Sequence, residues 1–99
     1  MKRIEIIFDE SNESEIMMIL RQAQVENWTR FHGITGHGSS GSKLNNAIGP
    51  GINNMLLVYV EDDMVERVTG AVRRFKEVAS AERGHAATRC IVSSIEEFI

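Results

Sequence analysis

Glycine is concentrated in one segment of this chain. Six of the eight glycines lie between Gly33 and Gly51, and the segment contains the run Gly36-His37-Gly38-Ser39-Ser40-Gly41. Residues 36–53 show neither a helical nor a strand period. So long a segment without regular structure in a small domain is usually functional or disordered. We therefore expect two structured halves joined by a central loop, and we expect the function to lie in that loop.

Each half predicts a strand, a helix and a second strand. Alternating or continuous apolar residues predict strands at 2–8, 28–35, 55–60 and 88–92, and apolar residues at helical spacing predict helices around 16–23 and 65–75. Ser11 or Asn12 can cap the first helix, and Asp62 and Asp63 the second. The order predicts a single α+β domain over residues 1–99. It would be a ferredoxin-like βαββαβ sandwich, with a four-stranded antiparallel sheet and two helices on one face.

The other face of such a sheet would carry Ile7, Phe31, Leu57 and Tyr59. An exposed apolar patch of this kind usually marks an interface. Association with further copies of the chain is therefore expected on physical grounds alone.

Composition excludes several classes of function. The net charge is −3 and the basic residues are scattered or paired, so no nucleic-acid partner is expected. The single cysteine, Cys90, cannot form an internal disulfide and suits a reducing compartment. The sequence shows no secretory signal and no apolar run long enough to span a bilayer. We therefore expect a cytoplasmic protein without membrane insertion.

Several motifs, in this order and spacing, resemble the nitrogen-regulatory P-II family and its P-II-like relatives. They are the opening Met1-Lys2-Arg3-Ile4-Glu5-Ile6-Ile7, the glycine element Gly36-x-Gly38-x-x-Gly41, the segment Val58-Tyr59-Val60-Glu61-Asp62-Asp63-Met64-Val65, Gly84, and the ending Ile95-Glu96-Glu97-Phe98-Ile99. The likeness covers nearly the whole chain. In the family the glycine element leads into the T-loop, and Gly84 lies at the position of the B-loop.

The resemblance implies a homotrimer whose sheets face inward. It implies clefts between subunits that bind ATP or ADP and 2-oxoglutarate in classical members. It also implies T-loops that dock onto a protein target, such as a transporter, an enzyme or a regulator. The chain departs from the classical pattern where Ser39-Ser40 replaces an Arg-Gln-Lys segment, where Leu57 replaces a glutamate, and where the C-terminal arginines would follow. An adenine nucleotide is thus the cofactor to test, and none is assigned from the sequence.

The resulting hypothesis is a P-II-like signalling protein, not an enzyme, that senses a small anionic effector. The effector site would combine a loop base with an opposing wall. The loop base is Gly36, His37, Gly38 and Gly41, and the wall is Gly84, His85 and Arg89. Successive backbone N–H groups can bind an anion, and Arg89 can pair with its charge. The effector would switch the conformation of residues 36–53 and so expose or hide a docking surface.

Two alternatives stay open. His32, His37 and His85 could bind a transition metal in a CutA-like, metal-responsive trimer. The protein could also be a structural oligomer without a ligand. A Rossmann site is excluded, because the glycine element follows the second strand and no long helix opens after it. No sequence context supports a catalytic Ser-His-Asp or Cys-His arrangement.

Overall fold

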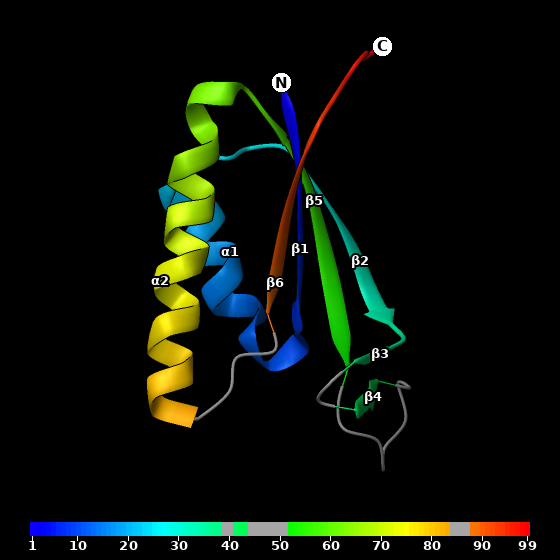
Figure 1. Cartoon of the computed structure of the whole chain (residues 1–99), viewed down its shortest axis with the longest axis vertical. Coiled ribbons are helices and arrows are strands. Elements are labelled where there is room, and N and C mark those ends of the chain that lie inside the picture. Colours follow the sequence, from blue (N-terminus) through cyan, green and yellow to red (C-terminus); the bar gives the residue numbers. More distant parts are fainter. Residues whose placement is uncertain (39–40, 44–51, 84–87) are drawn as a thin grey trace.

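The computed structural model describes residues 1–38, 41–43, 52–83 and 88–99. Two helices cover one face of a four-stranded antiparallel sheet, as the sequence predicts (Figure 1). The sheet has the order β2-β5-β1-β6, with strands β1 (Lys2–Asp9), β2 (Trp28–Ile34), β5 (Asn53–Val60) and β6 (Arg89–Ser94). The helices are α1 (Glu13–Gln22) and α2 (Val65–Arg83), preceded by the short 3-10 turns η1 (Glu10–Asn12) and η2 (Asp62–Met64).

The core lies between the sheet and the helices. Alternate residues of β1 and β5 point into it, and Ile4, Ile6, Phe8, Leu56 and Val58 are fully buried. The helices contribute the apolar stripes that their spacing predicts, namely Ile16, Ile19, Leu20, Ala23, Val68 and Val72. Burying these side chains is the main source of stability, at roughly 25 cal/mol for each Å² of apolar surface removed from water.

The capping predictions were correct only in part. Asn12 is the N-cap residue of α1, as predicted, but its side chain makes no capping bond. Asp9 caps the preceding turn η1, because its carboxylate accepts a hydrogen bond from the Ser11 N–H at 2.9 Å. At the turn η2 that precedes the second helix, Glu61 is the N-cap residue and makes no side-chain capping bond. Asp62 instead forms an ion pair with the N-terminal ammonium group at 3.0 Å. The hydrogen bond from that ammonium group lowers the pKa of the Asp62 carboxyl.

The central segment contains regular structure that the sequence did not predict. Strands β3 (Gly36–Gly38) and β4 (Gly41–Lys43) pair with each other, with Gly36 opposite Lys43 and Gly38 opposite Gly41. This small ladder lies at the end of the main sheet opposite to the two termini (Figure 1). The glycine element is therefore the two arms of a β-ladder, and not a segment without a period. Residues 39–40 and 44–51 lie outside the described part of the chain.

Among the described residues, neither helix combines the length and the apolar character that a membrane-spanning segment requires.

Candidate functional site

One face of the sheet carries no helix. Register fixes which side chains lie on it, because residues paired across antiparallel strands point to the same side. We call it the open face. Its members are Arg3, Glu5, Ile7, Asp9, Thr29, Phe31, Ile34, Asn53, Met55, Leu57, Tyr59, Arg89, Ile91 and Ser93.

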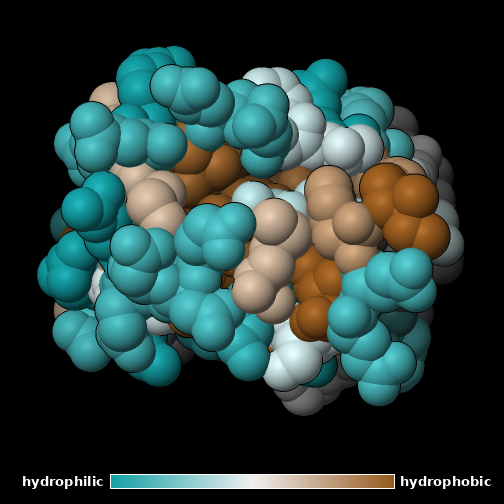
Figure 2. Space-filling view, turned by 90° about the horizontal axis from the view of Figure 1, so that it is seen from above, coloured by the Kyte–Doolittle hydropathy of each residue, from teal (hydrophilic) through white to brown (hydrophobic). Residues whose placement is uncertain are grey.

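Apolar side chains dominate this open face. Phe31, Tyr59 and Ile91 are 42%, 40% and 47% exposed, and Ile7, Met55 and Leu57 are half-buried. Figure 2, seen from the end that carries both termini, shows mostly hydrophilic side chains on the helical side, and apolar side chains mixed with hydrophilic ones toward the sheet. An apolar sheet face of this size is typical of an interface.

Four open-face residues form a row across the sheet, next to the row of Asp9, Asn53 and Ile34 at the loop end. Phe31 pairs with Met55, Met55 pairs with Ile7, and Ile7 pairs with Arg89. We call these four residues the loop row. It crosses the whole sheet from the edge strand β2 to the edge strand β6. Its one charged member, Arg89, is exposed at the β6 end.

The predicted effector residues lie at opposite ends of this row. Gly36, His37 and Gly38 follow β2, whereas Arg89 begins β6. With about 4.8 Å between neighbouring strands, the two edge strands are about 14 Å apart. Within one chain the structure therefore does not bring the loop base and Arg89 together. Gly84 and His85 lie outside the described residues.

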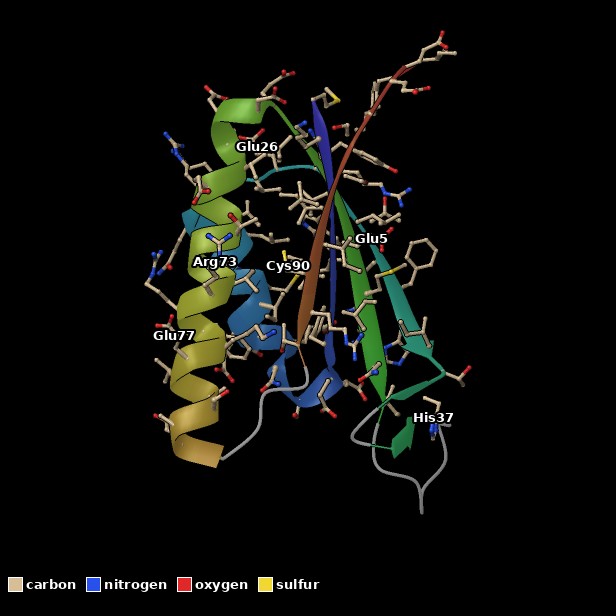
Figure 3. All side chains as sticks on the ribbon, viewed as in Figure 1. Glu5, Glu26, His37, Arg73, Glu77 and Cys90 are labelled. Carbon is tan, nitrogen blue, oxygen red and sulfur yellow. The ribbon has the colours of Figure 1, made fainter. Side chains whose placement is uncertain are left out.

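The backbone of the loop base is only in part available to an anion. Pairing of Gly36 with Lys43 and of Gly38 with Gly41 uses hydrogen-bonding groups that an open anion nest would need. His37 is exposed at this end of the molecule (Figure 3). A ligand that binds here would contact the outer edge of the ladder.

The described histidines do not form a metal site. His32 is exposed and its Nε2 lies 3.9 Å from Glu10 Oε1, while Cys90 is on the helix side of the opposite edge strand. His32 and Cys90 therefore do not meet across the sheet. Figure 3 likewise shows His37 and Cys90 far apart along the molecule. In the part of the chain that the structure describes, no three His, Cys, Asp or Glu side chains gather as metal ligands.

A buried polar cluster lies beside the loop and was missed by the sequence analysis. The Asn54 side chain is fully buried, and its amide bonds to the Gly33 N–H and to Glu13. The signal was available, since Asn53-Asn54 opens a strand that is otherwise apolar. A polar residue at a core position of a strand needs a partner, and that need could have pointed to the cluster.

Comparison with known proteins agrees with this architecture. The sequence matches the family described as Nitrogen regulatory protein P-II over residues 1–97, and the chain belongs to this family. No curated protein matches the sequence significantly. Because the family match is to P-II, the CutA-like alternative gains no support.

Solved structures of PII-like proteins have the same fold. CPII from Thiomonas intermedia K12, bound to ADP and bicarbonate, is 20% identical with a TM-score of 0.77, over 95% of this chain and 84% of that chain. CPII bound to ADP, AMP and bicarbonate has a TM-score of 0.78 with the same identity and coverage. A PII-like signalling protein from Thermus thermophilus is 17% identical with a TM-score of 0.61, over 95% of this chain and 84% of that chain. At such identities the likeness concerns the fold.

Proposed function

We propose that this chain is a P-II-like signal-transduction regulator, without enzymatic activity, that acts as a homotrimer in the cytoplasm. It senses a small anionic effector in clefts between subunits. It signals effector occupancy to a protein partner through the conformation of residues 36–53.

The observation that carries the proposal is the position of the two halves of the effector site. Residues 36–38 follow one edge strand of the sheet and Arg89 begins the other, so an anion that contacts both must lie between two copies of the chain. The apolar open face favours association of those copies, because covering it removes apolar surface from water. An effector held between copies would also contact the first residues of the loop.

The chemistry of the site favours an anion. Arg89 supplies a permanent positive charge, and the outer edge of the β3–β4 ladder supplies backbone N–H donors. The ligands named for CPII, which are ADP, AMP and bicarbonate, are all anions. We therefore propose that the effector of this chain is an adenine nucleotide, bicarbonate or both. Ser39-Ser40, in place of basic residues, favours weaker phosphate binding than in classical family members.

Native mass spectrometry of the intact chain tests the proposal directly. It should give a mass of three chains of 11.1 kDa each, with up to three bound ADP molecules when Mg-ADP is added. Calorimetry with Mg-ADP and with sodium bicarbonate then distinguishes the two effectors. A stable monomer that binds neither ligand would overturn the proposal.

A further inference from the structure

Strand β2 contains a bulge immediately before the central loop. Phe31 pairs with Met55 and Ile34 pairs with Asn53, so the step from 31 to 34 on β2 faces the shorter step from 55 to 53 on β5. One extra residue on β2 is thus accommodated opposite Asn54. Gly33 lies in the bulge with a φ of 69°, a left-handed conformation that glycine adopts without strain. The bulge sets the direction in which the chain leaves the sheet.

The Asn54 side chain holds this bulge. Its Oδ1 accepts a hydrogen bond from the Gly33 N–H at 3.0 Å, and its Nδ2 donates to Glu13 Oε1 at 3.0 Å. Asn54 is completely buried. A buried amide without partners is strongly unfavourable, so both bonds restrict where Gly33 and Glu13 can lie.

Glu13 connects the cluster to α1 and, through Arg30, to β2 again. It is the first residue of α1, and its second carboxylate oxygen, Oε2, accepts a hydrogen bond from Arg30 Nη1 at 2.9 Å. The contacts therefore form a ring through β2, β5, α1 and β2 again. We call Arg30, Gly33, Asn54 and Glu13 the polar ring.

The far end of the central loop is attached to the same region. The Glu10 N–H donates to the Ile52 carbonyl at 2.8 Å, immediately before β5 begins. The connection between β1 and α1 thus contacts the loop where it starts, through the polar ring, and where it ends, through Ile52. A displacement of the connection between β1 and α1 therefore affects the backbone at both ends of the central loop.

We propose that Asn54 is a positioning residue for the central loop, and that residues 10–13 are a control point separate from the open-face effector site. Breaking the Glu13–Asn54 bond releases Gly33, changes the exit angle of β2, and so weakens the loop's response to effector. The positioning role of Asn54 is argued from the geometry alone, whereas its effect on the response to effector rests on the proposed function.

Two matched alanine variants test the positional part. Asn54→Ala should raise hydrogen exchange of the Gly33 amide by about two- to tenfold, because the variant loses the hydrogen bond that this amide donates. Asn53→Ala is the control, because among the described residues Asn53 Oδ1 has no hydrogen-bond partner. The Val58 amide in the core reports global opening. The positioning role would be overturned if the Gly33 amide exchanged equally fast in the two variants. It would also be overturned if exchange of the Val58 amide in Asn54→Ala rose as much as that of the Gly33 amide.

Rescue separates positioning from simple packing. In Asn54→Asp, two carboxylates face each other and Gly33 exchange should rise. Adding Glu13→Gln restores one donor and one acceptor between the two positions, so Gly33 exchange should fall again by severalfold. A double variant that exchanges as fast as Asn54→Asp alone would contradict the polar ring.

The link to effector is tested by trypsin cleavage after Lys43, with and without Mg-ADP or sodium bicarbonate. Effector should slow cleavage in the parent and in Asn53→Ala, and should slow it severalfold less in Asn54→Ala. A normal response in Asn54→Ala would overturn the coupling. If even the parent shows no response to either ligand, the proposed function fails, while Gly33 exchange still decides the positioning role.

Discussion

Arg89 is the direct register partner of Ile7, so a cationic and an aliphatic residue are neighbours on the open face at the β6 end of the loop row. The neighbouring open-face residues, Met55 and Ile91, are also apolar. Attraction between charges increases where water is displaced. A copy of the chain that covers this face would therefore strengthen the attraction of Arg89 for an anion.

Arg89→Ala should abolish the protection of Lys43 by Mg-ADP or bicarbonate and leave the number of subunits unchanged. The physical reason is loss of a charge-assisted hydrogen bond, which is typically worth about 1.5–3 kcal/mol, or at least tenfold in affinity. Limited trypsin digestion and light scattering make the two measurements. Arg73→Ala on α2 is the control, since Arg73 is also exposed but lies on the other side of the sheet. If Arg89→Ala responds to the ligands like the parent, Arg89 is only a surface charge and does not bind the effector.

Met55→Glu should convert the assembly to monomers. Met55 lies on the open face between Ile7 and Phe31, and a carboxylate buried there in an interface would lack a partner. Val78→Glu is the matched control, because Val78 is 56% exposed on α2, away from the open face. Light scattering should give one chain mass for the first variant and three for the second. If Met55→Glu assembled over the same concentration range as the parent, the open face would be excluded as the interface.

Gly70→Ala should stabilise the protein. Gly70 lies inside α2, and an added Cβ would meet only Arg74 Nη1, at 3.5 Å, which is an ordinary contact. Alanine is favoured over glycine in a helix interior by about 1 kcal/mol. The free energy of unfolding, measured with urea, should rise by roughly 0.5–1 kcal/mol. A decrease in the free energy of unfolding would mean that the packing around Gly70 does not accommodate a Cβ.

Cys90 should react slowly with alkylating reagents at neutral pH. Burial raises the pKa of its thiol, and the positive charges of Arg73 and Lys76 oppose this rise only in part. Because the thiolate is the reactive form, the midpoint of the alkylation rate against pH should lie above that of a cysteine in an unstructured peptide. Arg73→Ala removes one of the opposing charges and should shift the midpoint further upward. Midpoints at or below the peptide value would contradict this assignment.

The fold could be predicted because local pattern and tertiary structure agree. Alternation in β1 and the helical spacing of Ile16, Ile19 and Leu20 each indicate one buried face, and one arrangement buries all of these faces together. The capping bonds were missed because several polar residues compete at each turn. Asp9, Ser11 and Asn12 are all competent caps. Asn12 takes the N-cap position of α1, but Asp9 makes the side-chain capping bond, at the turn η1.

The candidate site was predictable only in part. The register confirms that Phe31, Leu57 and Tyr59 share a face with Ile7. The roles of Gly36 and Arg89 as parts of one effector site remain predictions, because the two lie at opposite edges of the sheet in one chain. The polar ring depends on contacts between residues far apart in the sequence, such as Glu13 with Asn54, and such contacts leave no local period. The β3–β4 ladder is local, but its strands of 3 residues each are too short to show an alternation.

The ion pair between Arg3 and Glu5 has a consequence for how identical copies recognise one another. The two side chains lie on the same face of β1 and neutralise each other within one strand. A second copy placed over them needs no complementary charge at this point. Identical copies arranged around a rotation axis can therefore meet here without repulsion between like charges. Cohesion between copies should then depend little on ionic strength, while capture of an anion by Arg89 should weaken as salt is added.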